Sequence, residues 1–244
     1  MSAVLKTSLK PSPLRTTRAS VVADRLRRRI VTGQLLPETQ LRVNELAMVF
    51  ETAISPVREA LNRLSSEGLV DVHDMRGFFV ASASAPELQE ITLARCLLNE
   101  LALRQTIEHG DKQWEESVRL AYHRLARAPR QSAIREASSD WDDAHRVFHR
   151  TLTVGCGTRF LVDYCDQLFV KADRYRHLAR LSPKASARKR DTEHKQIMEA
   201  AINRDADQAA ALLRSHFEAT AELFLGAWTD TGQRNMSRRG SAQS

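Results

Sequence analysis

Apolar side chains recur every three or four residues near the start of the chain, which is the period of an α-helix. The side chains that set this period are Ala19, Val22, Leu26 and Ile30. The stretch "TGQLLP" at 32–37 then supplies a glycine and a proline, both of which end helices. The pattern predicts a first helix followed by a turn.

Two shorter helical patterns and a strand pattern follow. "NELAMVF" at 44–50 predicts one short helix, and "ETAISPVREALNRLSSEG" at 51–68 predicts a second that ends at its glycine. In "LVDVHDMRGFFVAS" at 69–82, apolar residues flank a polar tip, which is typical of a β-hairpin. Three helices and a hairpin in this order predict a winged helix-turn-helix domain over residues 16–82.

From Pro86 to residue 229 the pattern is helical throughout. Turn residues interrupt it at "HGD" (109–111), "APRQ" (128–131), "GCGT" (155–158), "SPKA" (182–185) and "NRDA" (203–206). Six helices joined by short turns predict an antiparallel all-α bundle. The fold class expected is therefore mainly α, with a disordered basic arm at 1–15 and a disordered polar tail at 230–244.

Composition narrows the class of protein. Hydrophobic residues make up 42% of the 244 positions, enough for packed cores, but no apolar run approaches the roughly 20 residues of a membrane-spanning helix. The N-terminus lacks the apolar core of a secretory signal, so we expect a cytoplasmic protein that does not enter a membrane. Cys96, Cys156 and Cys165 form no C-x-x-C pair and suggest neither disulfides nor a zinc ribbon.

Positive charge is concentrated at one end. Residues 1–32 contain eight Lys and Arg and one Asp, a net +7 that equals the formal charge of the whole chain. Such a bias suits a module that binds phosphates, although a solvated basic tail would look the same.

The second short helix of the winged domain has the pattern of a DNA-recognition helix. In "AISPVREALNRL", Val57, Leu61 and Leu64 form the packing stripe. The polar side chains left off that stripe, which can reach base edges and phosphates, are Ser55, Arg58, Asn62 and Arg63. The alternative for Arg58 is a surface ion pair with Glu59 or Glu51.

These residues carry a resemblance to the GntR family of bacterial transcriptional regulators. Leu41, Leu46 and Ala47 are followed by "PVREALNRLSSEGLV" at 56–70 and by a wing that ends in "RGFFVA". The resemblance implies binding to a palindromic double-stranded DNA operator. It places the DNA contacts on Asn44, Ala53, Ile54, Ser55, Pro56, Arg58, Arg76 and Gly77.

Two positions depart from the family pattern. Where the family commonly has Ser or Thr followed by Arg, this chain has Ala53 and Ile54. The change removes a hydroxyl that would cap the recognition helix and one donor to phosphate or guanine. We expect Arg25 to Arg29 and the basic arm to supply part of the missing attraction for DNA.

The helical half contains a second candidate site. "WDDAHRVFHRTL" at 141–152 places His145 and His149 one helical turn apart, at the inner edge of an apolar stripe. His194 and His216 lie on apolar faces of two later helical segments. Neutral imidazoles on neighbouring helices can bind a divalent transition metal, zinc or nickel, although an H-x-x-x-H pair is often only part of a core.

The helical half resembles the FCD-type ligand-binding domain of the FadR branch of GntR regulators, in its six-helix form. Members that bind metal use an Asp or Asn, a His four residues later, and two further histidines. "HRVFHRTL", "DTEHKQIMEAAI" and "LLRSHF" map this set onto His145, His149, His194 and His216, so His145 stands where the family more often has Asp. Asp142, one turn earlier, is the alternative ligand, or a carboxylate that orients an imidazole.

The resemblance also implies a small carboxylate effector and a homodimer. Arg95 matches an arginine common in the first helix of the domain, and Arg174 lies in "KADRYRHL". Either can pair with an effector carboxylate, or with Glu100 or Asp173 as a plain salt bridge.

Three functions compete at this point. A hydrolase related to H-E-x-x-H would need Glu as general base directly after the first His, and Arg146 occupies that position. We therefore expect no enzyme but a DNA-binding regulator, a repressor rather than an activator, controlled by an organic acid bound near a metal. The third possibility is a DNA-binding dimer whose helical half is only a scaffold.

Overall fold

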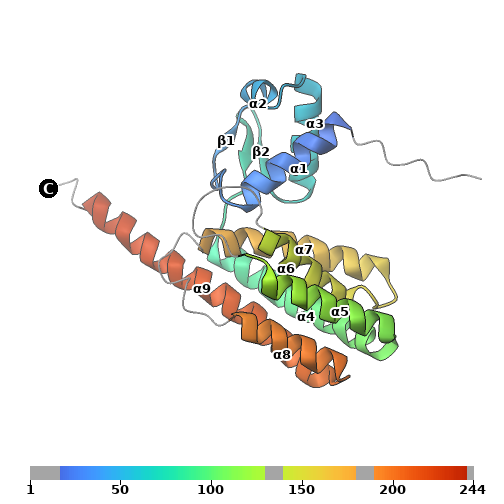
Figure 1. The fold of residues 1–244 in the computed structure, drawn as a ribbon. Helices are drawn as coiled ribbons and strands as arrows, with labels where there is room; N and C mark the ends of the chain where they lie inside the picture. The colour runs from blue at the N-terminus through green and yellow to red at the C-terminus, as the bar shows by residue number, and fades with distance from the viewer. Residues whose placement is uncertain (1–16, 130–139, 180–189, 241–244) are drawn as a thin grey trace, which may run out of the picture.

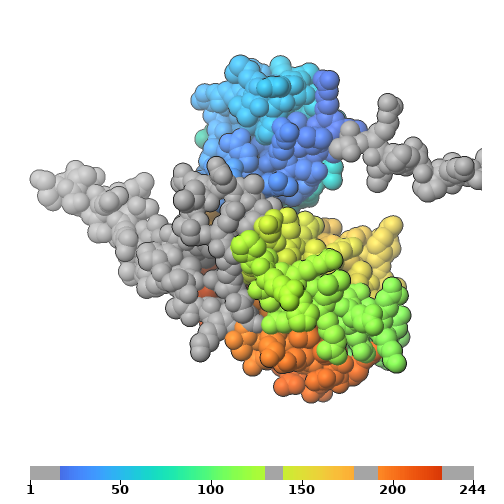
Figure 2. Space-filling model, in the orientation of Figure 1, coloured from blue at the N-terminus to red at the C-terminus, as the bar shows by residue number. Residues whose placement is uncertain are grey.

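The computed structural model describes residues 17–129, 140–179 and 190–240, which form two lobes (Figures 1 and 2). The arm predicted at 1–15 and the break predicted at 182–185 lie outside these residues, as does part of the break at 128–131. No described helix is both long and apolar enough to cross a membrane.

The first lobe is a winged helix-turn-helix. Its helices are α1 (Arg18–Val31), α2 (Val43–Val49) and α3 (Ile54–Ser66), and its hairpin is β2 (Val70–His73) and β3 (Gly77–Val80). A third strand, β1 (Gln40–Leu41), pairs antiparallel with β3 and gives the strand order β1-β3-β2. The strand β1 was not predicted, because two residues are too few to show an alternating pattern.

The packing stripe of α3 anchors this lobe. Val57, Leu61 and Leu64 are fully buried in one cluster with residues of α1 and the hairpin. The helix then ends at Gly68, whose φ of +72° is left-handed, and the Leu69 N–H donates to the Leu64 carbonyl at 2.9 Å. The predicted helix end is therefore confirmed, and it turns the chain directly into the hairpin.

The second lobe is all-α. Its described helices are α4 (Ala85–His109), α5 (Lys112–Arg127), α6 (Asp140–Thr153), α7 (Arg159–Ala179), α8 (Arg190–Ile202) and α9 (Ala206–Gly240). The sequence explains where several begin. Ser84 caps α4, with Pro86 in its first turn, and the Asp111 side chain caps α5 by accepting from the Trp114 N–H at 2.8 Å.

One boundary differs from the sequence prediction. The segment from residue 230 was predicted as a disordered tail, whereas α9 continues to Gly240. This segment is polar but contains no proline, the residue that most strongly stops a helix, and Gly232 alone does not break one.

The two lobes meet along α7. The linker between β3 and α4 is only Ala81 to Ser84, and Ala81 and Ala83 are buried. Helix α7 packs against α4, α6 and α9 in its own lobe and against α1 of the winged lobe. Figure 1 shows α7 on the side of the helical lobe that faces the winged domain.

Candidate functional site

Helix α6 brings the two histidines of "WDDAHRVFHRTL" into the core. Trp141, Phe148 and Leu152 form its buried stripe, and three acids in its first turn favour the helix N-terminus. His145 and His149 lie beside that stripe and are both buried, as their spacing predicts. Their Nε2 atoms are 3.1 Å apart.

Two further helices each bring a histidine to this pair. His194 from α8 and His216 from α9 are also buried, and one nitrogen from each of the four rings lies within 4.8 Å of the others. Two nitrogens bound to one metal at about 2.0–2.1 Å are about 3.3 Å apart in tetrahedral geometry. The separation between the His145 and His149 nitrogens is close to that value. The four rings are therefore close enough together to bind one metal ion.

The protonation of these rings suits metal binding. Burial, followed by the neighbouring imidazoles, lowers the pKa of His145 and of His149 well below the ordinary histidine value. The Nδ1 atoms of both rings are buried and have no hydrogen-bond partner among the residues that the structure describes. The Nδ1 of His216 lies 2.8 Å from a carboxylate oxygen of Glu193, an arrangement that fixes the orientation of the ring. The residues therefore fit a cation that prefers nitrogen ligands.

A small cavity adjoins the histidine cluster. Its volume is about 20 Å³, enough for an ion or a single water molecule. Its walls are Arg95, Trp141, His145, Phe169, Ala172, Asp173, Arg176, His216 and Thr220. Two arginines therefore share one cavity with the candidate metal ligands.

Arg95 lies where an anion could meet it. Its guanidinium carbon is 3.8 Å from the centre of the Phe217 ring, and within the described part of the chain its buried Nε has no hydrogen-bond partner. Burial lowers the pKa of Arg95 to about 10, which still leaves it charged at neutral pH. The alternative salt bridge to Glu100 is not formed, because Glu100 pairs with Arg104 and Arg214.

Asp142 occupies a different position from the one predicted. Its carboxylate accepts a hydrogen bond from Arg176 at 2.8 Å, and it is not among the grouped ligand atoms of the four histidines. Its role as metal ligand or effector contact stays a prediction; in the structure Asp142 orients Arg176, which itself lines the cavity. The reason is electrostatic, because a buried guanidinium attracts the nearest carboxylate more strongly than a neutral imidazole does.

Two members of this network were not identified from the sequence. Arg176 is buried and also pairs with Asp173 at 2.5 Å, while no described residue forms a hydrogen bond with its Nη1. The Nε2 of His177 lies 3.6 Å from a carboxylate oxygen of Asp142 and 3.5 Å from one of Asp173. The sequence had indicated no partner residues for this histidine. The signal available was the i, i+3, i+4 spacing of Asp173, Arg176 and His177, which places all three on one helical face.

Arg174 faces away from the cavity. It is buried, but it donates to the backbone carbonyls of Ala81 and Ser82 in the interdomain linker. It is not among the residues that line the cavity. Arg174 and Arg176 are two positions apart, which on a helix separates their directions by about 200°, so only one of them can face the cavity.

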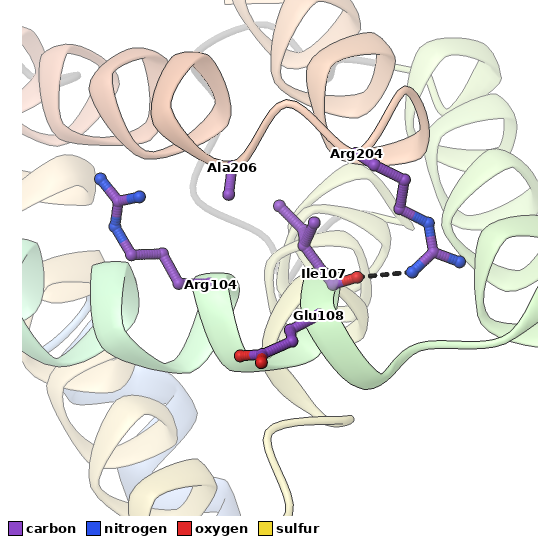
Figure 3. A pocket seen from close by; sticks show the side chains of 5 residues that line it. All are labelled: Arg104, Ile107, Glu108, Arg204 and Ala206. Atoms are coloured by element: carbon purple, nitrogen blue, oxygen red, sulfur yellow. Dashed lines mark hydrogen bonds between the residues drawn. The ribbon is translucent and has the colours of Figure 1, made fainter.

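A larger open hollow lies at the corner where α4 meets the turn between α8 and α9. Figure 3 shows its walls, formed by Arg104, Ile107, Glu108, Arg204 and Ala206. Arg204 donates to the carbonyls of Ile107 and Gly110 and pairs with Glu115 at 2.6 Å. These contacts occupy the guanidinium in closing the end of α4, so we assign this hollow a structural role.

The predicted DNA-reading residues are exposed on the winged lobe. Asn44, Ala53, Ile54, Ser55 and Arg58 are exposed at the starts of α2 and α3, Pro56 is half-buried, and Arg76 and Gly77 are exposed at the hairpin tip. As the sequence implies, no side chain caps the N-terminus of α3. Its first backbone N–H groups are therefore available to a phosphate.

The arginines near the recognition helix differ in whether they form ion pairs with other residues. Arg27 on α1 binds Glu67 through two nitrogens at 2.9 and 2.8 Å, so it holds α1 to α3 and contributes less to DNA attraction than the sequence suggested. Arg63 pairs with Glu67 at 3.4 Å. Among the described residues no partner is present for Arg58, so the alternative ion pairs with Glu51 and Glu59 are not formed.

Comparison with known families agrees with this arrangement. Residues 18–80 match the family described as bacterial regulatory proteins, gntR family, and residues 90–219 match the FCD domain. The chain belongs to the GntR family. It is a DNA-binding transcriptional regulator with an FCD domain, and both matched families consist of regulators rather than enzymes.

Individual relatives extend over most of this GntR regulator. It is 31% identical over 217 residues to the HTH-type transcriptional regulator BphR of Paraburkholderia xenovorans (strain LB400), covering 87% of this chain and 88% of BphR. It is 32% identical over 195 residues to the HTH-type transcriptional repressor GlaR of Escherichia coli (strain K12), covering 78% and 88%. The structure of E. coli McbR/YncC shares the fold, with a TM-score of 0.74 and 20% identity over 87% of this chain and 99% of that one.

The buried ion network makes a prediction about acid stability. Burial alone would raise the pKa of Asp173, but Arg176 and His177 outweigh it and hold that pKa well below its usual value. The stability that Asp173 contributes is therefore present above about pH 4 and is lost as the pH falls toward its folded-state pKa. Asp173→Asn should flatten the acid loss of unfolding free energy by up to about 1.4 kcal/mol per pH unit.

Urea unfolding at a series of pH values between 2 and 7 measures this slope. Asp163→Asn, on the exposed side of the same helix, is the matched control and should leave the slope as in the wild type. An unchanged slope in Asp173→Asn would show that the carboxylate is not held ionised by this network.

Proposed function

We propose that this GntR regulator is a homodimeric repressor whose operator affinity is set by a small organic acid bound beside a divalent transition metal. The observation that carries the proposal is the convergence of four buried histidines, two of which line a cavity together with Arg95 and Arg176. The relative GlaR is itself named a repressor. Because operators are chromosomal DNA, we place the protein in the cytoplasm.

The metal would be held by His145, His149, His194 and His216, and zinc and nickel are the best candidates for four nitrogen ligands. When bound, the ion supplies a Lewis acid to which a carboxylate oxygen can coordinate. The chain's own contribution is to keep the imidazoles neutral by burial and to fix His216 through Glu193.

The effector is proposed to be a small carboxylic acid, with a dicarboxylate or hydroxy acid as the first compounds to test. Arg95 has no carboxylate partner among the described residues, and its guanidinium is protonated and buried. A buried arginine without an anion gains a strong charge-assisted hydrogen bond when a carboxylate enters. The small cavity must widen to admit such a ligand, which would link occupancy to a change of conformation.

A homodimer fits the exposed apolar side chains of the helical lobe. Leu93, Leu97 and Leu101 lie one turn apart along α4 and are each more than half exposed, as are Phe160 and Tyr164 on α7. A row of this kind commonly marks a protein interface. Two copies related by a two-fold axis would present two recognition helices to the halves of a palindromic operator.

The scaffold interpretation remains the alternative. In that case the helical lobe would only dimerise the protein, and neither metal nor acid would alter DNA binding. The burial of four imidazoles whose nitrogens lie within 4.8 Å of one another argues against it, because gathering buried polar rings without a ligand is costly.

The DNA role predicts a specific effect of Arg58. Arg58→Ala should weaken binding to an operator selected from random DNA by the wild type, by about tenfold, and should reduce the salt dependence by about one phosphate contact. Fluorescence anisotropy over a range of salt concentrations measures both. Arg119→Ala, exposed on α5 of the other lobe, should change neither quantity. Unaltered binding and salt dependence would remove Arg58 from the interface.

The metal site predicts a stoichiometry. Protein purified without chelators should carry close to one transition-metal ion per chain, and His149→Ala and His194→Ala should each abolish it, because removing a ligand costs the site its geometry. Elemental analysis by mass spectrometry gives the ratio. His123→Ala, an exposed histidine on α5, is the control that should retain the metal. A wild type that is metal-free at normal thermal stability would contradict the site.

The effector hypothesis predicts a thermal shift. Metal-loaded wild type, screened against dicarboxylates and hydroxy acids, should be stabilised by at least one, and Arg95→Met should lose that stabilisation because the anion loses its guanidinium partner. Arg174→Met is the matched control, since Arg174 is equally buried but does not line the cavity. A broad screen without a hit would favour the scaffold interpretation.

A further inference from the structure

Helix α7 has two functional faces. Phe169, Ala172, Asp173 and Arg176 recur at helical spacing and all line the cavity beside the histidine cluster. The residues of the second stripe, which recurs at the same spacing on the other side of the helix, are Lys171, Arg174, Tyr175 and Leu178. Every member of this second stripe approaches the winged lobe or the linker that joins it to α4.

The contacts of the second stripe are specific. Arg174 donates to the carbonyls of Ala81 and Ser82, which are the first two residues of the linker. The Tyr175 hydroxyl accepts from the Ser84 N–H at 3.2 Å and donates to the Glu87 carboxylate. The linker backbone is therefore hydrogen-bonded to α7 at both ends.

The remaining members of the stripe touch the winged lobe itself. A Cβ built on Gly68, at the end of α3, would lie 2.9 Å from the Lys171 Nζ. A Cβ on Gly33, after α1, would lie 3.6 Å from a methyl carbon of Leu178. The winged lobe rests on the same face of α7 that holds the linker.

The linker is also tied to the wing. The Ala81 N–H donates to the Leu69 carbonyl at 3.0 Å, and the Ser82 N–H donates to the Asp71 carboxylate at 3.4 Å. A displacement of the linker would therefore move the hairpin and, through Gly68 and Leu69, the end of α3. These bonds form a short mechanical path from α7 to the recognition helix.

We propose that Arg174 and Tyr175 form a linker clamp, through which α7 converts occupancy of the ligand cavity on its other face into a change in the position of the DNA-reading lobe. The clamp residues are positioning residues, because neither lines the ligand cavity. The inference rests on one part of the proposed function, namely that a ligand binds in the cavity beside α7.

Burial explains why the clamp is stiff. Arg174 is only 3% exposed and Tyr175 only 2%, and the Tyr175 ring packs edge-on against Phe224 of α9 at 4.9 Å. Burial lowers the pKa of Arg174 without removing its charge at neutral pH, so its bonds to the linker carbonyls are charge-assisted and shielded from water. When α7 shifts, the linker therefore moves with it, and the hydrogen bonds from Arg174 and Tyr175 to the linker stay intact.

The test compares Arg174→Met and Tyr175→Phe with the wild type and with Arg159→Met, a change of an exposed arginine on the same helix. Arg174→Met keeps an apolar stem but removes the donors, and Tyr175→Phe keeps the ring on Phe224 and removes only the hydroxyl. Three quantities are measured with and without Zn²⁺: zinc affinity by calorimetry, operator affinity, and hydrogen–deuterium exchange of the peptide that contains the linker.

In the wild type and Arg159→Met, zinc should slow exchange in the linker and change operator affinity. Both clamp variants should bind zinc within about twofold of the wild type, while at least about nine-tenths of the zinc effect on linker exchange and operator affinity disappears. If either variant folds poorly, the other carries the comparison. Clamp variants that respond to zinc like the wild type overturn the proposal, and so does a wild type that binds zinc without any change in the linker.

A wild type that binds no zinc would contradict the proposed metal site rather than the clamp. The clamp is then judged in metal-free protein, where exchange in the linker should be about tenfold faster in both clamp variants than in Arg159→Met. Equal exchange in all four proteins would overturn the clamp by itself.

Discussion

A buried guanidinium group must be paired with a carboxylate, with carbonyl groups or with an aromatic ring. This requirement organises the helical lobe. Arg176 has two carboxylates, Asp142 and Asp173, and Arg174 has the linker carbonyls. Arg95 has neither and rests on the face of Phe217. An unpaired buried charge is among the most expensive features of a folded protein, so each of these solutions fixes the elements that provide it. The packing of α7 between α4, α6 and the linker follows from them.

The buried arginines beside the cavity differ in whether a carboxylate pairs with them. The pKa of Arg176 is raised because its two carboxylates outweigh the desolvation that would lower it. The pKa of Arg95 falls to about 10 because desolvation is the largest influence on it and no carboxylate pairs with it. Of the arginines beside the cavity, Arg95 therefore gains most from an anion that comes from outside.

Much of the architecture could be predicted from the sequence. The 3.6-residue period of α1, α3 and α6 and the glycine at the end of α3 are local signals, and they place the winged domain, the helical bundle and the inward histidines correctly. Strand β1 and the helical end of α9 could not be predicted, because one is too short for a pattern and the other is polar on every side. The histidines converge through tertiary packing of three helices, which spacing within one helix cannot specify.

The partners of the charged residues were harder to predict, and α7 shows why. A helix with one buried face reveals by its pattern which residues point inward, whereas α7 is enclosed on two sides and carries buried Arg, Tyr and His along with its apolar residues. Arg174 and Arg176 are then equivalent in sequence, and only the position of the winged lobe decides between them. The same two-sided burial that hid the cavity-facing arginine also places one helix in contact with both the cavity beside the histidines and the winged lobe. A helix of that kind cannot move on one face without moving on the other, because protein interiors are packed too densely to absorb the shift.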